Sequence, residues 1–259
     1  MVDIENPHAL NEGEIKAIRR ACLRANMAIY SCRSEVADKT IVADLGRHFG
    51  LQHLDNNLYA NDEGISALQV SSERRQFEYI PYSNKAISWH TDGYYNPLDR
   101  KIRSMVLHCV RPAAQGGENA LMDHEMLYML MRDENPHYIE ALMQPDVMTI
   151  PANIENGVEI RPEQTGPVFS VDEQTGHLHM RYTARTRSIE WKQDQTTLAA
   201  VKWLEELLAS DSPAIFHHRL TAGQGLICNN TLHTRSAFED KEGGLGRLVY
   251  RARFFERIV

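Results

Sequence analysis

The chain has 259 residues, and its 28 lysines and arginines against 35 aspartates and glutamates give a formal net charge of −7. A hydrophobic share of 42% and a charged share of 24% are ordinary for a folded globular protein, and the acidic balance disfavours a nucleic-acid partner. No apolar run approaches the roughly 20 residues that cross a bilayer, so we expect no membrane partner.

The cysteines indicate a reducing compartment. They form no C-x-x-C pair, and two of them lie inside apolar runs, so we expect buried thiols and no disulfide framework. The four residues are Cys22, Cys32, Cys109 and Cys228. The N-terminus lacks the basic and apolar regions of a secretory signal, so the expected location is the cytoplasm.

The N-terminal part of the chain is predicted to begin with a capped helix. Asn11 and Glu14 have the spacing of a capping box, and apolar residues then recur at helical intervals, which predicts a helix over 12–26. A second helix is predicted over 36–49, with a short strand at 28–30 between the two.

The rest of the chain is rich in predicted strands. Residues 123–143 have a helical pattern that is interrupted at Asn135-Pro136, and 146–190 hold short β-like runs separated by turn signals. A clear amphipathic helix is predicted over 196–209. Further strands are predicted over 67–70, 103–110, 225–229 and 247–255.

These elements define the fold class. Many short strands with flanking helices, and no regular strand–helix–strand alternation, argue against a doubly wound sheet. They favour a mainly β fold with flanking helices (α+β), of the sandwich or jelly-roll type. No linker divides the chain, so we expect a single domain over residues 1–259.

Two H-x-D triplets are candidate metal-binding motifs. About one or two matches are expected by chance, so context has to separate them. His53-Leu54-Asp55 runs into Asn56-Asn57 and is interpreted as a solvated loop. His90-Thr91-Asp92 follows an extended segment, in which residues i and i+2 point to the same side and could share a metal ion.

A third ligand must come from a distant part of the chain, and His233 is the best candidate because it follows an apolar strand and two turn-forming residues. Two histidines and one carboxylate on one face of an octahedral ion form the facial triad of non-haem Fe(II) oxygenases, which leaves positions open for O2 and an organic co-substrate. For His233 alone, a buried core histidine is an equally good interpretation.

Arginines alternate along the last predicted strand. Arg247, Arg251 and Arg253 fall on one face, and a guanidinium meets a carboxylate with two charge-assisted hydrogen bonds. A dicarboxylate that chelates iron at one end needs such a partner at the other. The alternative is a solvated basic face on a terminal strand.

Four sequence blocks, taken together, resemble the TauD/TfdA (taurine dioxygenase-like) family of Fe(II)- and 2-oxoglutarate-dependent oxygenases. They occur in family order over about 90–253. The blocks are W-H-T-D-G at 89–93, R-P-A-A-Q-G-G-E-N at 111–119, N-x-L-H-x-R-x-A-F at 230–238 and R-x-x-x-R at 247–251.

The resemblance implies a double-stranded β-helix (jelly roll) in which His90, Asp92 and His233 bind Fe(II) and Arg247 binds the distal carboxylate of 2-oxoglutarate. The implied reaction also consumes O2, releases succinate and CO2, and oxidises a small substrate, typically by hydroxylation. Family members usually carry Thr where this chain has Asn119. Asn119 departs from that pattern, and we predict that it still contacts the co-substrate.

Four residues are candidate substrate contacts. Arg251 could meet a substrate anion, as its family counterpart can, and Trp89 and Tyr94 flank the H-x-D motif, as do Tyr82 and Tyr95. Simple packing is the alternative for these aromatic residues.

Arg181 is the fourth candidate. It shares a face with His179 in an alternating run, and Arg185 and Arg187 follow. A cationic cleft in an acidic protein would favour an anionic small molecule, whereas a solvated edge strand is the alternative.

Two other classes of protein stay open. One is an iron-dependent oxidase on the same jelly roll that uses no 2-oxoglutarate, and the other is a non-catalytic jelly-roll protein that binds a small molecule. In each case the expected partner is a small molecule, and a homo-oligomer is compatible with the sequence.

Overall fold

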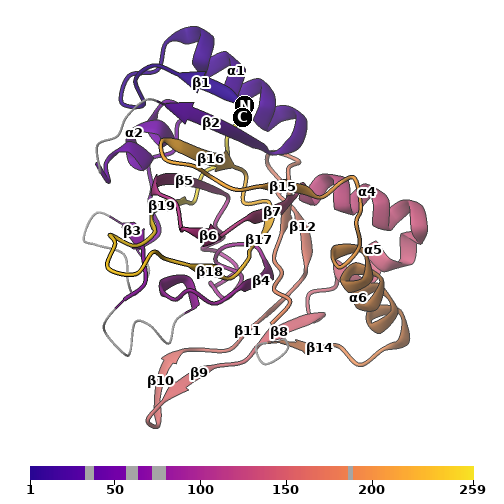
Figure 1. Cartoon of the computed structure of the whole chain (residues 1–259). Coiled ribbons are helices and arrows are strands. Elements are labelled where there is room, and N and C mark those ends of the chain that lie inside the picture. Colours follow the sequence, from indigo (N-terminus) through magenta and orange to yellow (C-terminus); the bar gives the residue numbers. More distant parts are fainter. Residues whose placement is uncertain (33–37, 57–63, 72–79, 186–188) are drawn as a thin grey trace.

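The larger sheet of the computed structural model runs through the upper half of the molecule (Figure 1). The structure describes residues 1–32, 38–56, 64–71, 80–185 and 189–259. The strand order is β1-β2-β16-β5-β19-β3, and only the β1–β2 pair among these is parallel. The strands are β1 Val2–Ile4, β2 Met27–Cys32, β3 Ile65–Leu68, β5 Ser104–Arg111, β16 Gln224–Cys228 and β19 Leu248–Phe254.

A smaller antiparallel sheet faces the larger one and has the order β15-β7-β17-β4. Its strands are β4 Ile87–His90, β7 Asn119–Met122, β15 Phe216–His218 and β17 Leu232–Arg235. Leu121 of β7 packs with Leu107, Leu226 and Val249 of the larger sheet in one buried cluster. The two sheets therefore enclose a common interior, as in a jelly roll.

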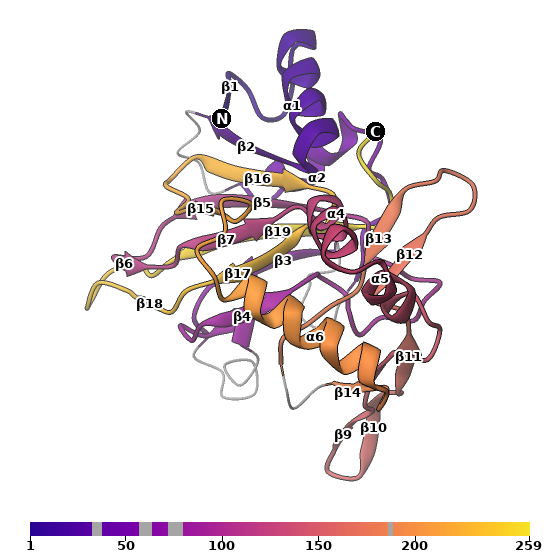
Figure 2. The same cartoon turned by 90° about the vertical axis from the view of Figure 1, so that its right-hand side faces the viewer.

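Helices cover the outer face of each sheet (Figure 2). Ile18 and Ile41, from the two N-terminal helices, pack against Val106 and Ala252 of the larger sheet. Leu204 of α6 lies in the cluster that covers the smaller sheet. The helices are α1 Glu12–Ala25, α2 Ile41–Arg47, α4 His124–Glu134, α5 Pro136–Leu142 and α6 Gln195–Leu208, and η1 Ile80–Tyr82 is a 3-10 turn.

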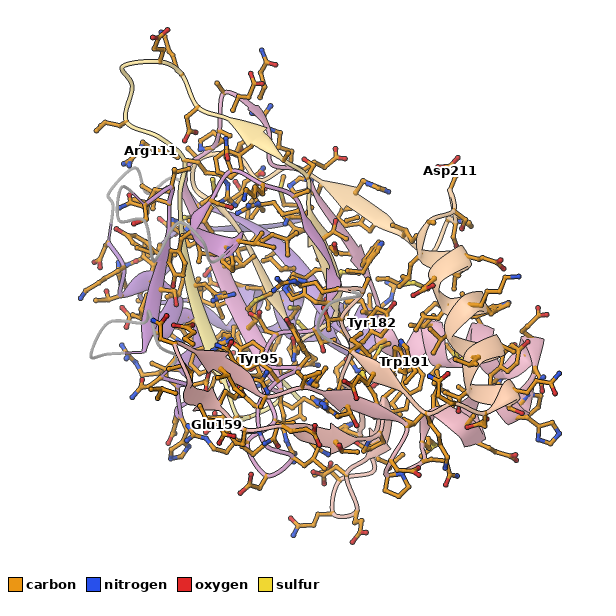
Figure 3. The ribbon with its side chains drawn as sticks, turned by 90° about the horizontal axis from the view of Figure 1, so that it is seen from below. Tyr95, Arg111, Glu159, Tyr182, Trp191 and Asp211 are labelled. Atoms are coloured by element: carbon orange, nitrogen blue, oxygen red, sulfur yellow. The ribbon has the colours of Figure 1, made fainter. Side chains whose placement is uncertain are left out.

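Short strand pairs complete the fold around the smaller sheet. Tyr182 and Trp191 pack there with their ring centroids 6.4 Å apart (Figure 3). The strands are β6 Gln115–Gly116 with β18 Phe238–Glu239, β9 Asn153–Glu155 with β10 Val158–Arg161, β12 Phe169–Val171 with β13 Leu178–Met180, and β8 Met148–Ile150 between β11 Gln164–Gly166 and β14 Glu190–Trp191.

The predicted mainly β fold with flanking helices is confirmed, and so are most element positions. The Asn11–Glu14 capping box is present at the start of α1, and Asn135 ends α4 and caps α5, because proline fits the first turn of a helix but not its interior. The second helix is shorter than predicted and begins at Ile41. Residues 36 and 37 of that prediction lie outside the described residues.

The prediction of a solvated loop at His53-Leu54-Asp55 is wrong. Asp55 is 4% exposed, its carboxylate forms an ion pair with Arg253, and Leu54 bridges to Phe254 of β19. His53 alone is exposed and contacts Glu256. Asn57 of that segment lies outside the described residues.

All four cysteines are free and buried, as predicted. Among the described residues, no helix combines the length and the apolar character that crossing a membrane requires.

The buried Asp55–Arg253 pair generates a stability prediction. Asp55→Ala leaves the Arg253 guanidinium buried without its closest counter-charge, so we expect the free energy of unfolding to fall by about 3 kcal/mol. The control is Asp133→Ala, which breaks the exposed Arg132–Asp133 pair and should cost no more than ~0.5 kcal/mol. Urea unfolding of both variants measures the difference, and equal losses would contradict the prediction.

Candidate metal centre

Neighbouring strands of the smaller sheet bring the three predicted ligands together. β17 pairs with β4 so that His233 lies directly opposite His90, and the two ring centroids are 4.2 Å apart. Nε2 of His90 lies 3.7 Å from a carboxylate oxygen of Asp92. One ligand atom from each of the three residues lies within 4.8 Å of the other two, and no other such group occurs among the described residues.

Main-chain carbonyls set the tautomer of both histidines. Nδ1 of His90 lies 2.9 Å from the carbonyl oxygen of Ser88, and Nδ1 of His233 lies 2.9 Å from that of Thr231. A carbonyl can only accept a hydrogen bond, so each Nδ1 carries the proton and each Nε2 presents a free lone pair. This is how metal-binding histidines are usually oriented.

Burial and neighbouring charges give the three side chains the charge states that a divalent cation needs. Burial, followed by the nearby His233, lowers the pKa of His90 to about 3, and burial also lowers the pKa of His233. Burial by itself would raise the pKa of Asp92, but Arg251 and Arg253 outweigh it and hold that pKa well below its usual range. Two neutral imidazoles and one carboxylate result at neutral pH.

The turn after Asp92 requires glycine. Gly93 has φ of +69°, and a Cβ at this position would meet Cγ1 of Ile102 at 2.4 Å. The chain therefore turns sharply away directly after the ligand.

The buried guanidiniums of Arg235 and Arg247 both lie against the aromatic ring of Phe238. The Arg247 guanidinium carbon is 5.3 Å from the centroid of the Phe238 ring, and that of Arg235 is 4.8 Å from it. Nη1 of Arg247 and Nε of Arg235 are buried and have no hydrogen-bond partner within the described part of the chain. Neither side chain forms an ion pair with a described carboxylate.

Arg247 fits an anionic co-substrate better than Arg235, whose Nη1 and Nη2 donate to the main-chain carbonyls of Pro81, Ser83 and Lys85. A buried charge is costly unless it is paired, and two like charges side by side add repulsion. Burial and then the charge of Arg247 lower the pKa of Arg235 to about 9. A dianion such as 2-oxoglutarate would supply the missing counter-charge, and the orphaned Nη1 of Arg247 is a free donor for its carboxylate.

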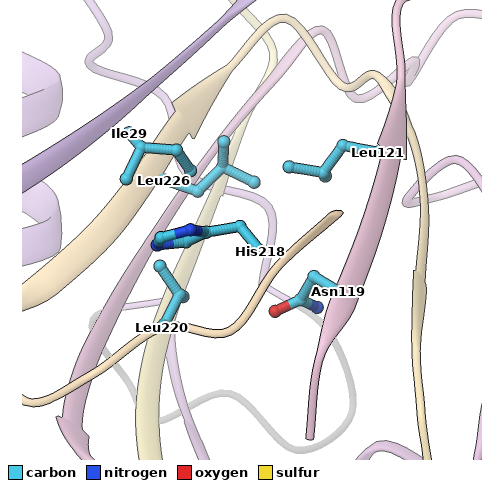
Figure 4. A pocket seen from close by; sticks show the side chains of 6 residues that line it. All are labelled: Ile29, Asn119, Leu121, His218, Leu220 and Leu226. Atoms are coloured by element: carbon cyan, nitrogen blue, oxygen red, sulfur yellow. The ribbon is translucent and has the colours of Figure 1, made fainter. Parts of the chain in front are cut away.

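Asn119 lines a small pocket in the interior (Figure 4). Its amide nitrogen donates to the carbonyl oxygen of Thr234 at 2.9 Å, which ties β7 to β17. Its role in co-substrate binding stays a prediction. The pocket is lined by Ile29, Asn119, Leu121, His218, Leu220 and Leu226.

Two of the predicted substrate contacts lie elsewhere. The Arg181 guanidinium is buried and donates to the main-chain carbonyls of Tyr94, Met148 and Gln164, so we withdraw it as a ligand-binding residue. Trp89 packs against the outer cluster that contains α6, and its indole N–H donates to the carbonyl of Leu208. Because neighbouring residues on a strand point to opposite faces, Trp89 points away from the side of His90.

The other two substrate candidates lie beside the metal ligands. Nη1 of Arg251 is 3.2 Å from both carboxylate oxygens of Asp92. The Tyr94 ring lies edge-on to His90, with 6.5 Å between the ring centroids. Both stay predictions as substrate contacts.

The remaining residues of the predicted cationic cleft and aromatic wall divide into two groups. Arg185 is exposed but its side chain hydrogen-bonds Tyr94, and the Tyr95 ring lies edge-on to that of Tyr94, 5.1 Å between centroids. Tyr82 instead belongs to the interior core. Burial lowers the pKa of His179. Arg187 lies outside the described residues.

Sequence reasoning missed that Arg235 and Phe238 pack with Arg247. Both belong to the quoted block at 230–238, but only the folded structure brings the two guanidiniums against one ring.

The chain belongs to a known family of enzymes. The family model described as "Taurine catabolism dioxygenase TauD, TfdA family" matches residues 2–253. A uridine-5'-phosphate dioxygenase from Amycolatopsis sp is 31% identical over 166 residues, which are 62% of this chain and 58% of that relative. The alignment thus spans little more than half of the relative's length.

Two solved structures share the fold. An asparagine oxygenase in complex with Fe(II), 3-hydroxyasparagine and succinate has a TM-score of 0.67 at 15% identity, covering 93% of this chain and 78% of that one. The non-haem iron oxygenase OrfP with Fe and alpha-ketoglutaric acid also has a TM-score of 0.67 at 15% identity, covering 95% and 80%. These likenesses confirm the jelly-roll fold.

The two H-x-D triplets provide a direct test of the metal centre. We expect His233→Ala to weaken binding of Co(II), a redox-stable substitute for Fe(II), by more than the 10–100-fold that loss of an outer partner costs. The control His53→Ala removes the histidine of the other triplet and should leave Co(II) affinity unchanged. Anaerobic titration by isothermal calorimetry measures both, and unchanged affinity in His233→Ala would contradict the assignment.

Proposed function

We propose that this chain is an Fe(II)- and 2-oxoglutarate-dependent dioxygenase that oxidises a small anionic molecule. The convergence of His90, Asp92 and His233, with lone pairs and charge states suited to a divalent cation, carries the proposal. Membership of the TauD, TfdA family favours iron over other divalent metals. Residues 1–259 are proposed to act as one oxygenase domain.

Each side chain has a proposed role. His90, Asp92 and His233 would hold the ion, and three protein ligands would leave it free to bind 2-oxoglutarate and O2 as well. Arg247 receives the distal carboxylate of 2-oxoglutarate and so fixes the direction of its chelating end. Together with the co-substrate and O2, the iron would supply the oxidation of a substrate C–H bond, with release of succinate and CO2.

An anionic substrate is favoured by Arg251, a cation beside the ligands whose Nε is buried and has no hydrogen-bond partner among the described residues. Arg251 lies in contact with Asp92, and Tyr94 borders His90. The Amycolatopsis relative is named for a nucleoside phosphate. Uridine 5'-phosphate is therefore the first substrate to test.

Substrate-dependent formation of succinate tests the proposed function. Purified protein with Fe(II), 2-oxoglutarate and ascorbate should release succinate at a rate that an anionic substrate raises. Turnover that needs iron but not 2-oxoglutarate would favour the oxidase class instead. Binding of a small molecule without iron-dependent O2 uptake would favour a non-catalytic protein.

Co-substrate binding should depend on Arg247. Arg247→Ala removes a buried, charge-assisted contact, so we expect the Kd for 2-oxoglutarate to rise by about 30-fold or more, equivalent to at least ~2 kcal/mol. Anaerobic titration that follows the visible absorption of the metal-chelated 2-oxo acid measures it. Arg132→Ala, which removes an exposed arginine, is the control, and an equal Kd in both variants would contradict the role of Arg247.

The charge of the substrate can be tested with a matched pair of compounds. We expect uridine 5'-phosphate to stimulate succinate release at least ten times more than uridine, because only the phosphate offers an anionic partner for the Arg251 guanidinium. Taurine and free amino acids extend the panel to other anionic and zwitterionic groups. Stimulation by uncharged compounds alone would show that the substrate is not anionic.

A further inference from the structure

Asn230 clamps the main chain of Asp92 with a single buried side chain. Its Oδ1 accepts a hydrogen bond from the Asp92 N–H at 2.8 Å. Its Nδ2 donates to the carbonyl oxygens of Asp92 at 2.9 Å and Ile102 at 2.7 Å. Asn230 is 2% exposed, so these three bonds form out of contact with bulk water.

Asn230 bonds Asp92 beyond the end of β4, where strand pairing no longer fixes the main chain. β4 ends at His90, and Asp92 lies beyond it in the turn that Gly93 completes. The amide side chain bonds the N–H and the C=O of Asp92, which flank its Cα on both sides. Fixing both groups limits rotation about the Asp92 backbone, and with it the direction in which the carboxylate leaves the Cα.

The same residue joins two segments that carry ligands. Asn230 lies three positions before His233, in the turn that leads into β17, and 138 positions after Asp92. Its φ is +50°, a left-handed conformation that asparagine adopts more readily than most residues. The turn therefore favours Asn, Asp or Gly at this position, and of these only Asn supplies both the acceptor and the two donors.

We propose that Asn230 is a positioning residue for the metal centre, which sets the carboxylate of Asp92 relative to His233 and thereby the affinity for the metal ion. The inference rests on the proposed function, because it takes Asp92 as a ligand. Outer partners that orient ligands typically contribute 10–100-fold to metal affinity, and that is the effect expected of Asn230.

The neighbouring residue Asn229 provides a matched control. It is also buried, at 3% exposure, and its Oδ1 accepts from the N–H of Ile258 while its Nδ2 donates to Asn26 and to the carbonyl of Ile258. It thus makes one accepted and two donated bonds, as Asn230 does, but to Asn26 at the end of α1 and to Ile258 near the C-terminus, which are not metal-ligand candidates.

The experiment compares Asn230→Gly with Asn229→Ala. Glycine tolerates the left-handed turn, so each variant loses three side-chain hydrogen bonds without added backbone strain. Thermal unfolding should show a lowered Tm for both variants. Anaerobic Co(II) titration should show affinity about 10–100-fold weaker for Asn230→Gly and unchanged for Asn229→Ala, and the visible Co(II) spectrum should change only in Asn230→Gly.

Each outcome has one interpretation. Wild-type affinity in Asn230→Gly, or an equal loss in both variants, overturns the positioning role. Failure of the wild-type protein to bind Co(II) overturns the proposed function itself, and this result is distinct because it appears before any variant is compared.

A second variant keeps the test decisive if Asn230→Gly does not fold. Asn230→Asp has nearly the same shape and keeps the acceptor for the Asp92 N–H, but it replaces the two donors. A new carboxylate near a cation would raise affinity by Coulomb attraction alone. Weaker Co(II) binding in Asn230→Asp therefore supports positioning, and affinity equal to or above that of the wild type overturns it.

Discussion

The register between β4 and β17 is the constraint on which the candidate metal centre depends. It places His233 opposite His90, and because strand side chains alternate, a slip of one residue would turn either histidine to the outer face. The outer face resists that slip. Leu232 is fully buried in the outer cluster, and Trp89 bonds its indole N–H to the end of α6. Packing on the outer face of the smaller sheet therefore determines which side chains, including both histidines, face the interior.

Charge is distributed very differently inside the fold and over the whole chain. The protein carries a net charge of −7, yet among its described residues more arginines than acidic residues are buried. Arg251 and Arg253 are paired with Asp92 and Asp55. Arg235 and Arg247 share the Phe238 ring, and neither side chain forms an ion pair with a described carboxylate, although Asp240 lies near Arg247 and its main-chain N–H. A site of this kind gains more from binding an anion than an exposed pair would, because little water competes for the charges.

The sequence predicted local features well, because short-range chemistry controls them. The capping box at Asn11, the break at Asn135-Pro136 and the alternation of Arg251 and Arg253 depend on neighbours a few residues away. Arg247 lies outside β19, before a register shift between Leu248 and Val249, so its predicted place on the same face stays a prediction. Errors arose where the partner is distant. Asp55 seemed solvated in a polar segment, but Arg253, almost 200 positions later, buries it.

Two of the four predicted substrate contacts lie away from the ligands for a related reason. Arg181 has the residue type and the alternation of an anion-binding side chain, but three carbonyls from separate segments take up its donors. Trp89 is next to a ligand in the chain and therefore on the other face of the strand. Proximity in sequence suggested a shared pocket for residues that the pleat of the strand separates.

By itself, the sequence determined the element types, the class of fold and the residue chemistry of the ligands, since these follow from periodicity, turn residues and side-chain donor atoms. It could not separate His233 from an ordinary core histidine, nor link Asn230 to Asp92. Only the tertiary structure brings His233 opposite His90 and Asn230 against Asp92, because strand pairing and buried hydrogen bonds join groups more than 130 positions apart, and no local pattern encodes which distant carbonyl or carboxylate a side chain will meet.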